Sequence, residues 1–112
     1  MGYSRGRPVA IEGANGDSPR TEIMDMTTFE WTPGAEQTVH SSYWREFSII
    51  QKDFDTFFIV GGKTEENGHV PTVLKYQADV WSQLGDLVHA RWWSGLAING
   101  NELLVMGGIA AR

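Results

Sequence analysis

The sequence predicts an all-β protein built from a repeated unit of short antiparallel strands. The chain has 13 glycines and five tryptophans in 112 residues, and a motif of four large apolar residues followed by two glycines occurs twice. Glycine reaches positive φ in tight turns, and aromatic side chains pack well on pleated sheets. No window shows a sustained period of 3.6 residues in its hydrophobic positions. Together these features predict short strands joined by tight turns, without helices.

The glycine-pair motif is the clearest sign of a repeat. It occupies residues 57–62 and 103–108, which lie 46 positions apart. The same offset aligns Arg45 with Arg91, and it places an Asn-Gly pair at residues 99–100 between two apolar runs. Asn-Gly in that setting is the strongest short-range signal of a β-hairpin.

A degenerate first copy extends the repeat toward the N-terminus. Residues 26–31 align with residues 76–81 at an offset of 50, with Met26 where the later copy has a tyrosine. Residues 9–13 take the place of the glycine-pair motif, with a glutamate replacing the first glycine. Three copies at a period of 46 to 50 residues indicate a repeat architecture.

The complete middle copy predicts four strands. They cover residues 45–51, 55–62, 72–77 and 79–84. Regularly spaced strands with turn signals predict a sandwich, a barrel or a propeller rather than alternating strands and helices. The polar, glycine-containing residues 65–69 predict a loop between the second and third strands.

In these repeated features the sequence resembles the kelch family. A glycine pair ends the second strand, an aromatic residue follows on the third, and a tryptophan lies on the fourth. The resemblance covers residues 8–108, and it implies an all-β, kelch-type β-propeller with four-stranded antiparallel blades around a channel. It assigns a structural role to these residues of the repeat motif: Gly13, Trp31, Gly61, Gly62, Tyr76, Trp81, Gly107 and Gly108.

The chain then corresponds to a partial propeller of about two and a quarter blades over residues 1–112. We expect an incomplete blade of three strands at 8–34, a complete blade at 41–85 and the first two strands of another at 89–108. A propeller has ~4–8 blades. We therefore expect either a longer parent chain or an assembly of several copies that completes the ring.

The candidate binding residues lie where the last strand of one blade leads into the first strand of the next. They are Tyr43, Trp44, Arg45, Arg91 and Trp92. Arginine and tryptophan are enriched in interface hot spots, and the resemblance implies that arginines in this region contact acidic or polar partners. The alternative is that the aromatic residues pack between blades and the arginines bridge the blades by hydrogen bonds.

Charge and hydropathy argue against two classes of partner. The net charge is −5 with a pI near 5.0, and no basic run is present, so we expect no nucleic-acid binding. The longest apolar runs hold four residues, whereas a membrane-spanning helix needs roughly 20. We therefore expect no membrane insertion.

The remaining composition predicts neither a cofactor nor a metal. His40, His69 and His89 are isolated in the sequence, and no catalytic grouping of side chains stands out. The absence of cysteine and of an N-terminal signal peptide leads us to expect a cytoplasmic protein.

The sequence thus predicts a non-enzymatic kelch-repeat scaffold that binds a protein partner. One alternative is a fragment of a propeller-containing enzyme of the oxidase or sugar isomerase type. The copper oxidases of that group use a cysteine-modified tyrosine, and this chain has no cysteine. Another alternative is a propeller piece that self-associates through exposed blade edges.

Overall fold

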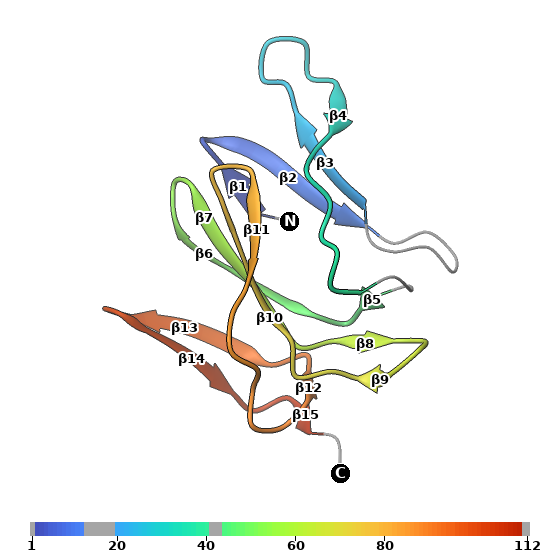
Figure 1. Cartoon of the computed structure of the whole chain (residues 1–112). Coiled ribbons are helices and arrows are strands. Elements are labelled where there is room, and N and C mark those ends of the chain that lie inside the picture. The colour runs from blue at the N-terminus through green and yellow to red at the C-terminus, as the bar shows by residue number, and fades with distance from the viewer. Residues whose placement is uncertain (1, 13–19, 41–43, 111–112) are drawn as a thin grey trace.

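The computed structural model describes residues 2–12, 20–40 and 44–110. In those ranges every regular element is a β-strand, and all paired strands are antiparallel (Figure 1). The all-β prediction is therefore confirmed. No helix in this part of the chain has the length and apolar character needed to cross a membrane.

The first sheet has four strands in chain order. They are β1 (Gly2–Ser4), β2 (Arg7–Glu12), β3 (Arg20–Met24) and β4 (Trp31–Pro33). The sequence predicted three, and β1 is the additional strand. Arg5 and Gly6 have φ angles of 53° and 75°, and this two-residue turn of positive φ joins β1 directly to β2.

The hairpin between β3 and β4 is longer than its counterpart in the second copy. Trp31 pairs with Met24, whereas Trp81 pairs with Tyr76. Six residues separate the first pair and four separate the second. The prediction that Met26 occupies the position of the tyrosine is therefore wrong, because the offset of 50 residues crosses turns of different length.

The second sheet also has four strands, in the order β6-β7-β10-β11. These are β6 (Ser48–Asp53), β7 (Thr56–Val60), β10 (Val73–Gln77) and β11 (Val80–Gln83). They lie within three residues of the four strands predicted for the middle copy. Residues 65–69, predicted as a loop, instead end in the short strand β9 (Gly68–His69). This strand joins β8 (Lys63–Thr64) and β5 (Trp44–Arg45) in a small three-stranded sheet.

The C-terminal part repeats the start of this arrangement. The third sheet is the hairpin of β13 (Gly95–Asn99) and β14 (Glu102–Met106), with Gly100 at a φ of 60° in its turn. β12 (Arg91–Trp92) pairs with β15 (Ile109–Ala110), as β5 pairs with β8 one unit earlier. The hairpin predicted from the Asn-Gly pair is confirmed.

The apolar core lies mainly between the first and second sheets. Its central residues are Val9, Ile23, Phe57, Ile59, Leu74 and Tyr76. The ring of Phe57 stacks on that of Tyr76 with centroids 5.0 Å apart, and Trp81 packs edge-on against both rings. Trp31, the counterpart of Trp81, is instead exposed on the outer strand of the first sheet.

The first strands of the three sheets lie side by side in the order β1, β6, β13. The side-chain amide of Gln51 on β6 accepts a hydrogen bond from the backbone N–H of Tyr3 and donates to its carbonyl. At the other end of β6, the hydroxyl of Ser48 donates to the carbonyl of Ser94 at 2.8 Å. Consecutive sheets therefore meet through equivalent strands.

The glycine pair at 61–62 lies at the joint between the second and third sheets. Gly61 and Gly62 have φ angles of 68° and 101°, which side chains rarely tolerate. A Cβ on Gly61 would meet the carbonyl oxygen of Arg91, and one on Gly62 would lie 2.7 Å from that of Arg45. The close approach of backbone to backbone therefore requires glycine at both positions, in keeping with a structural role.

Alanine substitutions at Gly61 and Gly107 distinguish the cost of backbone strain from the cost of a steric clash. Gly107, the counterpart of Gly61, has a φ of 62° but no atom within 4 Å of the position that a Cβ would occupy. We expect Gly107→Ala to lower the free energy of unfolding by about 1 kcal/mol, from strain alone, and Gly61→Ala to lower it by about 2–4 kcal/mol. Urea unfolding of both variants measures the difference. Equal losses would contradict the contact with Arg91.

Ala78 offers a second test of turn strain. Ala78 and Asp79 form the two-residue turn between β10 and β11 with φ angles of 51° and 62°. Glycine at position 78 removes the strain of positive φ in the folded state, but it raises the conformational entropy of the unfolded chain. The first contribution is the larger, so we expect Ala78→Gly to stabilise the protein by about 0.5 kcal/mol. Ala97→Gly, in the middle of β13, is the control and should destabilise it. Thermal unfolding of the two variants should shift in opposite directions.

Candidate functional site

The small sheet β5-β8-β9 presents a row of basic residues on its outer face. Trp44 pairs with Thr64, and both side chains are buried. The neighbouring row joins Arg45 to Lys63 and Lys63 to His69, and all three are partly exposed. Since directly paired residues share a face and successive residues alternate, this second row points away from the core. We call Arg45, Lys63 and His69 the basic row.

Trp44 belongs to the core and not to a binding surface. Its side chain is only 1% exposed, its ring lies against His40 and Phe47, and its Nε1 donates to the carbonyl of Gly61 at 2.9 Å. The prediction that Trp44 binds a partner is therefore wrong, because the pleat of β5 turns this residue inward and Arg45 outward. Tyr43, also predicted at the site, lies outside the described residues.

Trp92 extends the basic row with an aromatic surface. Its ring stacks on His69 with centroids 3.3 Å apart and planes inclined by 17°. This contact links β12 to β9, so residues 23 positions apart in the chain form one continuous patch. Lys63 and His69 were not predicted as site residues, because only the pairing of β5, β8 and β9 brings them to Arg45.

Arg91 is held by the backbone of the glycine pairs. Its guanidinium donates to the carbonyl of Gly107 at 3.1 Å, and its own carbonyl accepts a hydrogen bond from the N–H of Gly62 at 2.8 Å. The side chain remains partly exposed. The guanidinium therefore bonds within its own unit, and the hydrogen bond to the second unit is made by the Arg91 backbone.

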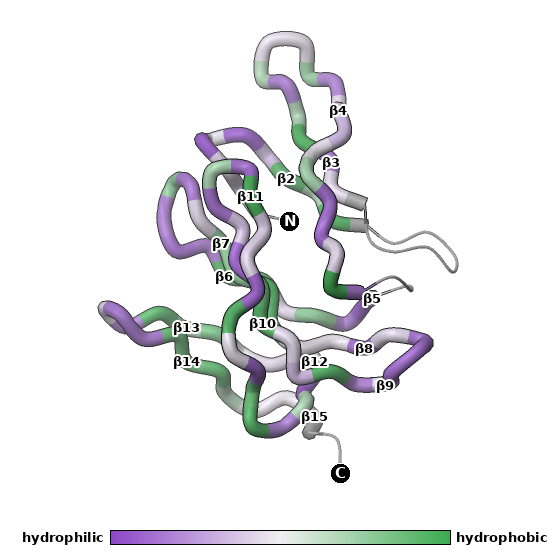
Figure 2. The backbone as a smooth tube through the Cα atoms, viewed as in Figure 1, coloured by the Kyte–Doolittle hydropathy of each residue, from purple (hydrophilic) through white to green (hydrophobic). Residues whose placement is uncertain are grey.

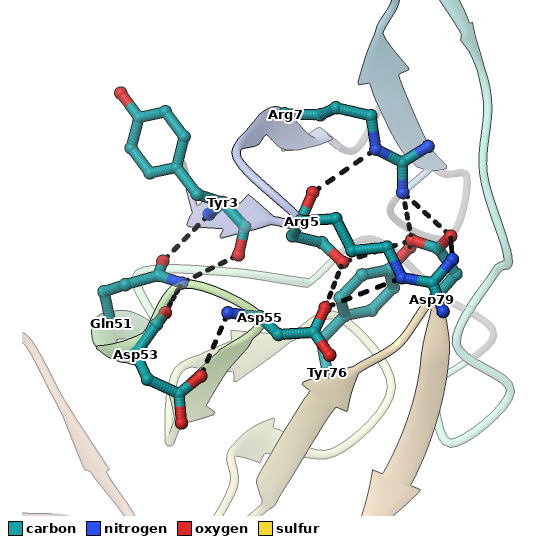
Figure 3. Close-up of polar contacts among 9 residues, drawn as sticks. Tyr3, Arg5, Arg7, Gln51, Asp53, Asp55, Tyr76 and Asp79 are labelled. Atoms are coloured by element: carbon teal, nitrogen blue, oxygen red, sulfur yellow. Dashed lines mark hydrogen bonds and ion pairs between the residues drawn. The ribbon is translucent and has the colours of Figure 1, made fainter.

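A second cluster of charged groups lies where three turns meet (Figure 3). The Nη2 atom of Arg7 lies 2.8 Å from each carboxylate oxygen of Asp79. The hydroxyls of Ser4 and Tyr76 each donate to the same carboxylate at 3.2 Å, and Ser4 also reaches Asp55 at 3.4 Å. These contacts tie the turn between β1 and β2 to the turns of the second sheet.

The electrostatics of this cluster fix its protonation state. Burial raises the pKa of Asp79, but the hydrogen bond and charge of Arg7, with the bonds from Ser4 and Tyr76, outweigh it and hold the pKa below its usual value. Burial, and then the charge of Asp79, raise the pKa of the Tyr76 hydroxyl well above its usual range. At neutral pH Asp79 is therefore a carboxylate and Tyr76 a proton donor, an arrangement suited to holding two sheets together.

His40 and the acidic residues give no metal centre in the described part of the chain. His40 Nε2 and the hydroxyl of Thr72 lie 2.8 Å apart in the core. Desolvation lowers the pKa of His40, although the charges of Glu66 and Asp86 oppose the shift. Among the residues that the structure describes, no three His, Asp or Glu side chains are grouped to hold a metal ion.

Comparison with known proteins gives no family for this chain. No protein-family model matches the sequence, and no curated protein matches it.

The contacts of Asp79 predict a specific dependence of stability on pH. We expect Asp79→Asn to lower the free energy of unfolding at pH 7 by about 1–2 kcal/mol, because the amide cannot carry the charge that Arg7 binds. The pKa of Asp79 is lowered in the folded state, so the stabilisation is full above about pH 4 and is lost as the pH falls through the folded-state value. Urea unfolding at about pH 7, 4 and 2.5 should show the two proteins converging in acid.

Asp25→Asn is the matched control for this prediction. The backbone N–H groups of Thr27 and Thr28 donate to the Asp25 carboxylate and lower its pKa, and they can still donate to the side-chain oxygen of an asparagine. We expect a smaller change in stability for this variant. A constant gap between wild type and Asp79→Asn across the whole pH range would contradict the ionic role of Asp79.

Proposed function

We propose that this chain is a non-enzymatic interaction module of the kelch type, part of a β-propeller that binds a protein partner. Two four-stranded antiparallel sheets in chain order, followed by the first hairpin of another, support this fold. The alignment of β1, β6 and β13 also supports it, because consecutive propeller blades meet along equivalent strands. The glycine pair at the joint between the second and third sheets agrees with the repeat signature.

The observation that carries the binding function is the basic row with Trp92 beside it. A planar guanidinium and an ammonium group suit carboxylates, and a partly exposed indole gives apolar area at low entropic cost. The chain as a whole has a net charge of −5. Arg45 and Lys63 supply the cationic groups of the row, which favours a protein segment that carries carboxylates as the ligand.

The same observation favours a protein over a nucleic acid as the partner. Nucleic-acid binding depends on neutralising many phosphates along an extended basic surface. The basic row spans only three residues, and the turn between β8 and β9 carries Glu65 and Glu66 next to it. A short acidic and aromatic peptide matches the size and the mixed character of this patch. We also propose that the protein is cytoplasmic and acts as a scaffold without a cofactor.

Fluorescence anisotropy with a labelled peptide of alternating glutamate and tyrosine tests this proposal. We expect the peptide to bind and Lys63→Glu to weaken binding at least tenfold, which corresponds to about 1.4 kcal/mol. Added salt should weaken the wild-type interaction, because the charges are partly exposed. Arg45→Ala should weaken binding while circular dichroism shows an intact fold.

Lys52→Glu provides the charge-matched control. Lys52 is exposed on β6, away from the small sheet, and its reversal changes the net charge by the same amount. Equal weakening by Lys52→Glu and Lys63→Glu would reveal unspecific attraction and overturn the assignment to the basic row. Failure of the wild-type protein to bind the acidic peptide would do the same.

A further inference from the structure

In the described part of the chain, no sheet covers the outer face of the third sheet, whereas the third sheet covers the equivalent face of the second. Val60 on β7 is 1% exposed, whereas its counterpart Met106 on β14 is 51% exposed. Phe58 is half-buried and lines a cavity of about 230 Å³ together with Leu103 of the third sheet, whereas its counterpart Leu104 is exposed. Leu104 and Met106 occupy the same positions in the repeat as Phe58 and Val60. The two pairs differ in exposure because, of the second and third sheets, only the second is followed by a further sheet in the described residues.

Strand pairing assigns these side chains to one face. Leu104 pairs with Ala97, and Met106 pairs with Gly95, so the four residues share a face of the hairpin. The opposite face of the hairpin carries Leu103 and Ile98, which line the cavity between the third sheet and the second. We call Ala97, Leu104 and Met106 the tail face, and Figure 2 shows the hydrophobic character of β13 and β14, to which it belongs.

Among the described residues, the first sheet also has an outer face without a covering sheet, at the other end of the series of sheets. Val9 and Ile23 pair with each other and point into the core, so the residues next to them point outward. The outward residues include two exposed aromatic rings and the exposed side chain of Glu22. We call the apolar ones the head face: Tyr3, Pro8, Ala10, Met24, Trp31 and Pro33.

We propose that the tail face of one copy of this chain stacks on the head face of a second copy. This contact continues the series in which the first sheet stacks on the second and the second on the third. Tail and head faces are different surfaces, so the association is heterologous and leads to a ring or an open chain. It uses residues outside the basic row, so it does not depend on the proposed partner binding.

The charge of Glu102 beside the tail face is opposite to that of Arg5 beside the head face. Within the chain, Arg5 in the turn after β1 lies 3.9 Å from Asp55 in the turn after β6, so these turns occupy the same end of adjacent sheets. The corresponding end of the third sheet carries Glu102, and the side chain of Arg5 is 56% exposed. Stacking of tail on head therefore brings the Glu102 turn toward Arg5 of the second copy.

A mixing experiment tests the proposal directly. Leu104→Glu blocks the tail face, and Tyr3→Glu blocks the head face; both residues are exposed, so circular dichroism should show folded proteins. In sedimentation velocity we expect wild-type protein to associate as its concentration rises and each variant alone to remain monomeric. An equimolar mixture should form a 1:1 dimer, because each variant keeps the face that the other lacks.

Several outcomes would overturn the proposal. Wild-type protein that stays monomeric at about 100 μM, where a contact of even modest affinity is populated, would exclude this association, as would a mixture that stays monomeric. Tyr3→Glu alone forming dimers would indicate pairing of two β14 edges in place of head-to-tail stacking. Val88→Glu, at an exposed apolar residue outside both faces, should associate as wild type does, and Met106→Glu replaces Leu104→Glu if that variant fails to fold.

Discussion

The close approach of backbone to backbone at the glycine pair is the constraint on which the rest of the structure depends. The N–H of Gly62 donates to the carbonyl of Arg91 at 2.8 Å, and a Cβ on Gly61 would occupy the place of that oxygen. Any side chain here would separate the second and third sheets. The contact also places β12 beside β9, and the ring of Trp92 therefore stacks on that of His69. The joint between sheets and the candidate binding surface therefore have the same origin.

Most of the fold follows from local features of the sequence. Apolar runs, glycine pairs and the Asn-Gly turn each determine their own strand or hairpin, and the four strands of the second sheet and the hairpin of the third were predicted from them. Two features were not predicted: the additional strand β1 and the pairing of Met24 with Trp31. Both depend on turn length, since an alignment by offset cannot reveal that one hairpin has two more turn residues than its counterpart.

The candidate site was predictable only in part, because its members come together through strand pairing. Arg45 and Trp92 were predicted from residue type and repeat position. Trp44 was assigned to the same surface, yet its pairing with Thr64 turns it inward. Lys63 and His69 have no motif in common with Arg45, and only the register of three two-residue strands aligns them.

The two joints between sheets differ in how they resist opening. The first joint combines the apolar core around Phe57 with the partly buried ionic contacts of Asp79. The second depends on backbone hydrogen bonds and on half-buried residues around a cavity of about 230 Å³. Because local stability follows buried apolar contact, we expect the hairpin β13–β14 to open more readily than the equivalent, more buried hairpin β6–β7. Any molecule that binds the outer face of the folded hairpin therefore stabilises it against opening.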